Sequence, residues 1–205
     1  DFGRCLPGAV QSPALPRSRR YFTLLQPKID YVASHARLLS CLGAGTTLDA
    51  AAFEARAASI LSRLESDPRT AAIAHGVAVP FILPRLTIDD MGQSLDHRFL
   101  PAVREAFEGT YPDYRFANHH RGGLEGRTGI QPESRHARLV AAMSRSELVG
   151  IYFPALSEYS LPAALEQVTA LPEQFLLAGG VDTCAALISA PGLLLRTDSY
   201  PPLLW

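Results

Sequence analysis

The densest group of chemically reactive side chains lies between residues 118 and 127 of the sequence. Histidine can donate or accept a proton near neutral pH, and arginine can bind a carboxylate or phosphate through two N–H groups. Glycines leave backbone N–H groups accessible to an anion. The combination favours a site for a small anionic ligand or substrate. The candidates are His119 and His120 for general acid or base catalysis, and Arg121, Arg127, Gly122 and Gly123 for ligand binding.

The same stretch is also typical of a solvated surface loop without a chemical role. Glycine-containing polar loops are common on protein surfaces, and most of their histidines take no part in catalysis. Two adjacent histidines do not make a zinc site, because zinc needs three or four converging ligands and no second matching pair is evident. Both interpretations of the loop stay open, and we predict no metal centre.

Asp89 and Asp90 are a second pair of candidate catalytic residues, in a loop after a predicted strand at residues 77–83. Paired carboxylates can bind a divalent cation or share a proton. Capping of a helix or turn is the simpler explanation, because Asp is favoured at such positions. For these carboxylates to assist His119 or His120, the two loops must meet at one end of the sheet.

Other polar residues point to structural roles. His136 lies on the apolar face of a predicted helix, as a hydrogen-bonded core histidine would. Asp182 follows two glycines, as in a turn, and Cys41 and Cys184 lie in apolar surroundings typical of inert thiols. The sequence has no G-x-S-x-G nucleophile motif, no phosphate-binding P-loop and no strand-linked G-x-G-x-x-G. It therefore holds no complete catalytic constellation and identifies no cofactor.

The elements that would position these residues begin with two predicted helices. One runs from Pro27 to Gly43, and the other from Thr46 to Glu65 with Thr46 or Thr47 as its cap. The short connector at residues 43–45 predicts that they form an antiparallel helical hairpin. Apolar periodicity predicts further helices at residues 69–75, from Pro101 to Gly109, from Pro132 to Met143, and from Ser160 to Val168.

The strands are predicted mainly in the second half of the chain. We expect an α+β fold, with the helical hairpin followed by a mixed, largely antiparallel sheet that has helices on one side. Tight turns near residues 179–182 and 190–192 predict a C-terminal meander. A flexible basic and Pro-rich arm is expected at residues 1–20, before a single domain at residues 21–205. The predicted strands are residues 77–83, 114–117, 149–153, 174–178, 183–189 and 193–197.

Composition and charge indicate a globular domain and argue against several classes of partner. The chain has 47% hydrophobic and 19% charged residues, which is ordinary for a globular domain. Its formal charge of −1 argues against nucleic acid or an anionic membrane as the main partner. No segment approaches the roughly 18 to 20 apolar residues of a membrane span, and no signal-peptide core is present. Three widely spaced cysteines form no disulfide framework, which favours a cytoplasmic location.

The C-terminal part of the chain carries a pattern of apolar residues and glycines. Its stretch from Leu161 to Leu195 contains Leu171-Pro172, then Phe175-Leu-Leu-Ala-Gly-Gly, then Asp182 and Ala185-Ala-Leu-Ile. This pattern is similar to an uncharacterised bacterial family of about this length that is frequent in actinobacteria. The family has a hydrophobic strand that ends in Gly, followed by Asp and a second apolar strand. The resemblance implies no known activity, and the excess of Arg over Lys also favours a bacterial source.

Two functional hypotheses follow. Without a complete catalytic constellation, we first expect a non-catalytic interaction or regulatory module that binds a protein partner or forms a homo-oligomer. The alternative is an enzyme or binder of a small anionic ligand. In that case Arg121 and Arg127 hold the anion, His119 or His120 moves a proton, and Asp89 or Asp90 assists. A minor third possibility is nucleic-acid binding by the basic residues at 17–20.

Overall fold

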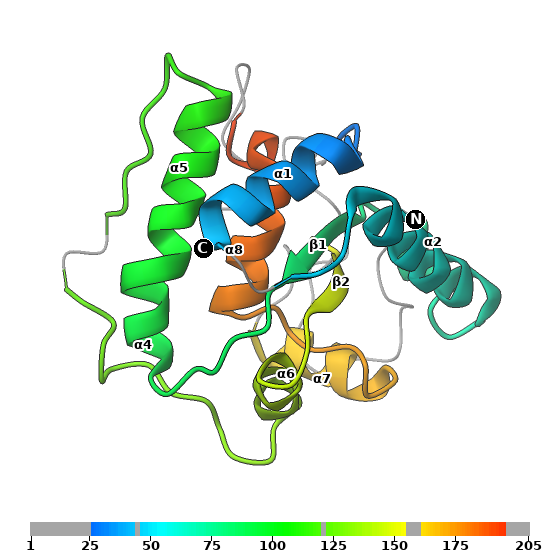
Figure 1. The fold of residues 1–205 in the computed structure, drawn as a ribbon. Helices are drawn as coiled ribbons and strands as arrows, with labels where there is room; N and C mark the ends of the chain where they lie inside the picture. Colours follow the sequence, from blue (N-terminus) through cyan, green and yellow to red (C-terminus); the bar gives the residue numbers. More distant parts are fainter. Residues whose placement is uncertain (1–25, 44–45, 120–121, 155–160, 196–205) are drawn as a thin grey trace.

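The computed structural model describes residues 26–43, 46–119, 122–154 and 161–195, which form an α+β fold (Figure 1). The predicted arm at residues 1–20 lies outside these ranges. The helices are α1 (Tyr31–Leu42), α2 (Ala50–Ser66), α3 (Ala71–Ala74), α4 (Met91–Ser94), α5 (Leu100–Thr110), α6 (Arg135–Met143), α7 (Leu161–Ala170) and α8 (Gly180–Ser189), with the π-helix η2 (Leu95–Phe99) and the 3₁₀-helix η3 (Pro191–Leu194). The strands are β1 (Val79–Leu83) and β2 (Leu148–Tyr152).

Strands β1 and β2 pair antiparallel, with Phe81 opposite Gly150, which confirms two of the predicted strands. All of β1 is buried. A Cβ at Gly150 would lie 2.4 Å from the ring of Phe81, so the ring needs a glycine opposite it. Proline has no N–H to give to a ladder and is confined to edge positions. The Pro80 carbonyl instead accepts a hydrogen bond of 2.6 Å from Ser189 Oγ on α8, which joins the sheet to that helix.

Helix α8 lies at the centre of the fold. In Figure 1 it lies behind α1, between α5 and the two strands, and it packs against all four of these elements. Val181, Ala185 and Ile188 have no exposed surface. Because neighbours surround this helix, it has no polar face and therefore no amphipathic period in its sequence.

The predicted C-terminal meander is wrong. Residues 183–189 belong to α8, residues 191–194 form η3, and residues 174–178 form no strand. At the predicted turn, the Asp182 carboxylate accepts the Gly179 N–H at 3.0 Å, which is one half of a capping box and starts α8. Short apolar runs do not distinguish a buried strand from a buried helix, and here tertiary burial favours the helix.

The predicted strand at residues 114–117 is also wrong, so the described sheet has two strands rather than a larger mixed set. The Phe116 N–H donates to Glu108 Oε1 at 3.0 Å, and Arg115 Nη1 donates to the Pro112 carbonyl at 3.1 Å. These bonds direct the polar groups of the segment towards α5 and the turn after it. The Phe116 N–H is therefore not available to a strand ladder.

Helices α1 and α2 occur where they are predicted, but they do not form a hairpin. Tyr31, the first residue of α1, packs edge-on against Phe53 in the first turn of α2, with ring centroids 5.3 Å apart. The His35 ring lies 2.7 Å from the Leu48 carbonyl. The start of α2 therefore lies beside the start of α1, whereas a hairpin would bring it to the end of α1.

The N-termini of several helices are capped by short polar side chains. Asp30 caps α1, Asp49 caps α2 and Ser134 caps α6, each accepting a backbone N–H three residues later. This corrects the prediction that Thr46 or Thr47 caps α2. Those threonines come too early, because the helix begins only at residue 50.

Arginine side chains cap the C-termini of three helices, α1, α7 and α8. Arg98 donates to the Leu42 carbonyl at the end of α1 at 2.6 Å. Arg37 donates to Ser189 and Ile188 at the end of α8, and burial lowers its pKa. Arg135 donates to carbonyls at the end of α7 and just beyond it. A cation at a helix C-terminus binds unpaired carbonyls and complements the helix dipole, so part of the chain's arginine content serves the fold.

Candidate functional site

The candidate site is built on a helix with a π-turn. Helices α4, η2 and α5 follow one another without a break from Met91 to Thr110. A π-turn inserts an extra residue into an α-helix and is frequent at functional sites. Here it carries Asp96, His97 and Arg98, three of the polar residues that face the neighbouring loop or a surface depression.

The loop at residues 122–128 is bound to this helix through carboxylates. Asp96 Oδ2 accepts the N–H groups of Leu124 and Glu125, at 2.5 and 3.2 Å. Asp90 Oδ2 accepts the N–H of Gly126 at 2.9 Å. The two predicted loops therefore do meet. Three backbone N–H groups that could have bound a free anion, those of residues 124–126, bind the protein's own carboxylates instead.

Glycines permit this close contact. A Cβ at Gly92 would lie 1.7 Å from the Leu124 carbonyl oxygen, so only glycine lets the loop backbone approach α4. Gly126 has φ of +67°, a left-handed conformation that glycine adopts without strain. Gly123 is exposed, and a Cβ there would lie 3.3 Å from Asp96 Oδ2. At Gly92 and Gly126, the glycines therefore serve packing and chain direction.

The predicted ligand-binding side chains are spread over the loop surface. His119 and Arg127 are exposed, and Gly122 is half-buried. Arg127 Nη1 lies 3.4 Å from the carbonyl of Gly123, so its guanidinium turns back on its own loop. His120 and Arg121 lie outside the described residues.

Asp90 caps α4, as the simpler explanation of the sequence predicted. Its Oδ1 accepts the Gln93 N–H at 2.7 Å. The backbone hydrogen bonds from Gln93 and Gly126 lower the pKa of Asp90. Asp89 is exposed. The Asp90 carboxylate is thus committed to two backbone donors, which is a structural use of a candidate catalytic residue.

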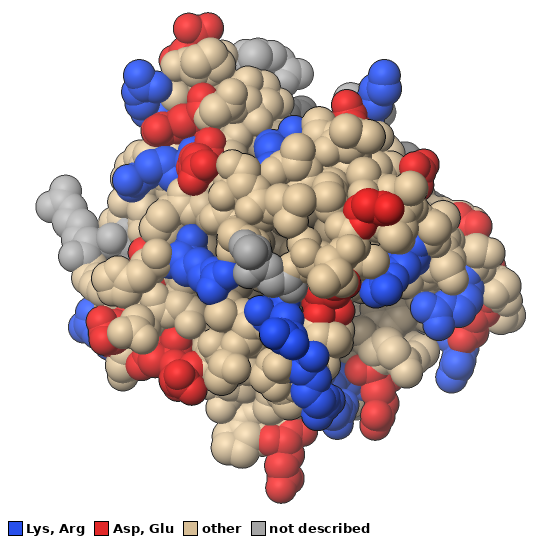
Figure 2. Space-filling view, in the orientation of Figure 1, with Lys and Arg blue, Asp and Glu red and all other residues tan. Residues whose placement is uncertain are grey.

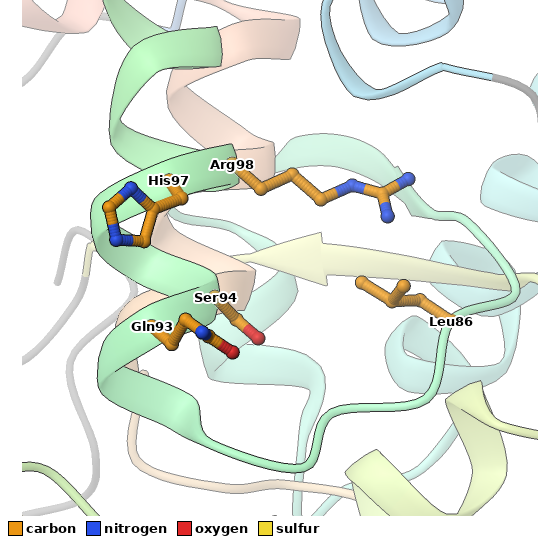
Figure 3. Close-up of a pocket in the computed structure, with 5 residues that line it drawn as sticks. All are labelled: Leu86, Gln93, Ser94, His97 and Arg98. Atoms are coloured by element: carbon orange, nitrogen blue, oxygen red, sulfur yellow. The ribbon is translucent and has the colours of Figure 1, made fainter. Parts of the chain in front are cut away.

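A shallow depression of about 280 Å³ lies beside the π-turn. In Figure 3, Arg98 extends towards Leu86 on one side, Ser94 and Gln93 lie below it, and His97 lies at the opposite edge. The polar residues of this depression were not predicted from the sequence, although residues 93, 94, 97 and 98 have the spacing of one helix face. The lining residues are Leu86, Gln93, Ser94, His97 and Arg98.

A second polar cluster lies at the start of α8. His136 Nε2 is 3.6 Å from Asp182 Oδ1, and the Asp182 side chain is only 8% exposed. Gly179 leaves room for the imidazole, because a Cβ there would lie 2.2 Å from its ring atoms. Burial, with the nearby Asp182 charge, raises the pKa of Tyr152 and of Cys184 to about 12 each. Cys184 is thus a buried, protonated thiol, as the sequence predicted. His136 has a polar neighbour, but it is half-buried and lies beyond hydrogen-bond distance of Asp182, so the prediction of a hydrogen-bonded core histidine is not confirmed.

Neither the charges on the face shown in Figure 2 nor the metal-ligating side chains of the described residues form a further candidate site. Over the face in Figure 2, basic and acidic side chains are interspersed, without a broad area of one sign. Among the described residues, no three His, Cys, Asp or Glu side chains converge in a way that could hold a metal ion. None of the described helices has the length and apolar character to cross a membrane.

Comparison with known proteins gives no relative. No protein-family model, no curated protein and no solved structure matches the chain. The resemblance of residues 161–195 to an actinobacterial family therefore stays a prediction, and functional inference depends on the geometry above.

Proposed function

We propose that this protein is a non-catalytic interaction or regulatory module that binds a protein partner or a second copy of itself. The observation that carries the proposal is the use of the candidate catalytic loop. Its Leu124, Glu125 and Gly126 N–H groups bind Asp96 and Asp90, and Asp90 also caps a helix, so these polar groups are committed to structure. A surface held in this way suits recognition better than turnover.

Exposed apolar side chains provide positions at which the proposal can be tested. Val32 on α1 is 71% exposed, and the next residue on the same helix face, Ala36, is also exposed. Leu165 on α7 is 49% exposed. Single exposed apolar residues are ordinary in monomers, so these positions are useful mainly as probes of an interface.

Size-exclusion chromatography with light scattering, over a range of protein concentrations, tests self-association. We expect a mass above that of the monomer as the concentration rises. If the protein is monomeric, we expect it to retain a specific protein that binds again when purified. The variants Val32→Glu and Leu165→Glu, compared with each other, would show which surface is used. A strictly monomeric protein that retains no partner would contradict the proposal.

The alternative, a binder or enzyme for a small anion at the loop of residues 119–127, is favoured by one observation. The bond between Asp90 and Gly126 brings together the two loops that this function requires. In this case Arg127 would turn away from the Gly123 carbonyl to hold the anion, while His119 moves a proton.

Isothermal titration with inorganic phosphate tests this alternative. We expect binding that Arg127→Ala weakens by about tenfold, the effect of losing one charge-assisted hydrogen bond. Arg115→Ala, another exposed arginine outside the loop of residues 122–128, is the matched control. Equal weakening by both variants would exclude a specific site on the loop.

A further inference from the structure

The depression beside the π-turn is rich in hydrogen-bond donors. Gln93 has an amide, Ser94 a hydroxyl, His97 an imidazole and Arg98 a guanidinium, and no carboxylate lines the depression. Leu86 forms an apolar wall. A donor-rich surface with one apolar side fits a small molecule that has an acidic group and a short hydrocarbon portion.

A carboxylate of the protein already binds at the rim of this depression. Glu125 Oε1 accepts a hydrogen bond from Gln93 Nε2 at 3.3 Å, and Glu125 Oε2 lies 3.7 Å from His97 Nε2. The His97 and Glu125 side chains are 69% and 57% exposed, so the contact is open to solvent. A weak, exposed contact of this kind is easily replaced. The rim therefore accepts a carboxylate, and Glu125 occupies it without being buried there.

The nearby acidic residues do not oppose an anion as strongly as their number suggests. Asp96 points at the amides of Leu124 and Glu125, and Asp90 at those of Gln93 and Gly126. These N–H dipoles offset part of each negative charge. Arg98 Nη2 donates to the Leu42 carbonyl at 2.6 Å, which holds the guanidinium beside the depression. A guanidinium has five N–H donors, and this bond uses one of them.

We propose that this depression binds a small carboxylate-bearing molecule through Ser94, His97 and Arg98, and that Glu125 competes with the ligand at the rim. The site is separate from the amides of residues 124–126, which are bound to Asp96 and Asp90. It does not depend on the interaction role proposed above, because a monomeric protein could bind such a ligand equally well.

Amide chemical shifts in ¹H–¹⁵N NMR spectra, recorded during titration with succinate, test the proposal. We expect saturable shifts at Ser94, His97 and Arg98. Titrations with inorganic phosphate and with sodium chloride, at the same ionic strength, separate carboxylate recognition from binding of any oxyanion and from general screening. Saturation by succinate at lower concentration than by phosphate is the expected order.

Single substitutions test whether succinate binds in this depression. Ser94→Ala and His97→Gln, both at surface-accessible positions, should each weaken succinate binding by about fivefold to tenfold. Glu125→Gln removes the competing carboxylate and should strengthen binding severalfold. Glu173→Gln makes the same charge change at a 77% exposed side chain that pairs with Arg138, and it should leave binding unchanged.

Two results would overturn the proposal. One is the absence of saturable shifts at residues 93–98 with succinate. The other is an equal effect of Glu125→Gln and Glu173→Gln, which would mean that only net charge matters. Since the light-scattering experiment does not involve succinate, its result cannot be confused with either outcome.

Discussion

At the scale of single residues, two aspartates connect the helix of the candidate site to the neighbouring loop. Asp90 joins the start of α4 to Gly126, and Asp96 joins the π-turn to two further amides. A carboxylate that accepts backbone N–H groups is stabilised in its charged form. The loop at residues 122–128 is therefore held in place by the carboxylates of Asp90 and Asp96.

Asp90→Asn should loosen this loop. The pKa of Asp90 is lower in the folded protein than its ordinary value of 3.8, so its contribution to stability is present above about pH 4 and is lost as the pH falls through the folded pKa. The protection factors for hydrogen exchange, which are corrected for the intrinsic rate at each pH, should therefore fall at Gly126 and Gln93 in Asp90→Asn, and in the wild type at low pH. Asp89→Asn is the control. If both variants exchange alike, Asp90 does not anchor the loop.

Two glycines in the same continuous helix should respond to alanine in opposite ways. Gly92→Ala places a methyl group against the Leu124 carbonyl, and we expect a loss of about 1–3 kcal/mol, as for other overpacked sites. A Cβ at Gly109 meets nothing within 4 Å, so Gly109→Ala should stabilise the protein by up to about 1 kcal/mol through helix propensity. Urea unfolding measures both. A neutral Gly92→Ala would show that the loop does not contact α4.

At the scale of elements, the ends of helices are joined to distant segments by arginines. Arg135 on α6 makes five hydrogen bonds to carbonyls between Val168 and Phe175, which hold the end of α7 and the following turn against α6. An arginine can bind this many carbonyls because its planar guanidinium carries five N–H donors in a fixed fork, which a lysine ammonium lacks.

Arg135→Ala should therefore cost about 2–3 kcal/mol of unfolding free energy, since it leaves several half-buried carbonyls without a donor. Arg135→Lys should recover less than half of that loss, because an ammonium lacks the fork. Arg138→Ala is the matched control on the same helix. Its side chain is 54% exposed and lies 3.8 Å from Glu173, so the change should stay within about 0.5 kcal/mol. Similar losses for the two alanine variants in urea would argue against this cap.

At the scale of the whole molecule, the fold is organised around a buried helix. Helix α8 contacts the sheet, α1 and α5. At its start the Asp182 carboxylate accepts the Gly179 N–H, and at its end Arg37 and Ser34 donate to the Ser189 carbonyl. Its burial also holds Tyr152 and Cys184 in their neutral forms.

Stability should consequently fall in alkaline solution. The ordinary pKa values of Cys and Tyr are 9.0 and 10.0, and in the folded protein Cys184 and Tyr152 titrate at about 12. Because both pKa values are raised, their contribution is complete below pH 9 and decreases between pH 9 and 12. The double variant Tyr152→Phe, Cys184→Ala should flatten this part of the stability curve, measured by urea unfolding at each pH. An unchanged slope would show that other groups cause the alkaline loss.

The sequence by itself determined the helices with a clear apolar stripe, the two strands and the α+β class. Apolar periodicity is a local property, so α5 begins and ends within one residue of its predicted bounds, and α2 ends within one residue of its own. The glycines and reactive side chains of the sequence also identified the loop at residues 122–128. They did not show that Asp90 and Asp96 accept its N–H groups.

Only the tertiary structure decided the rest. Helix α8 was predicted as a strand because a helix buried on all sides shows no amphipathic period, and its neighbours on α1, α5 and β1 are distant in sequence. The same holds for the depression at Arg98 and the pair of His136 and Asp182. Contacts between distant segments, and the burial they produce, determine these features, and neither is a property of local sequence.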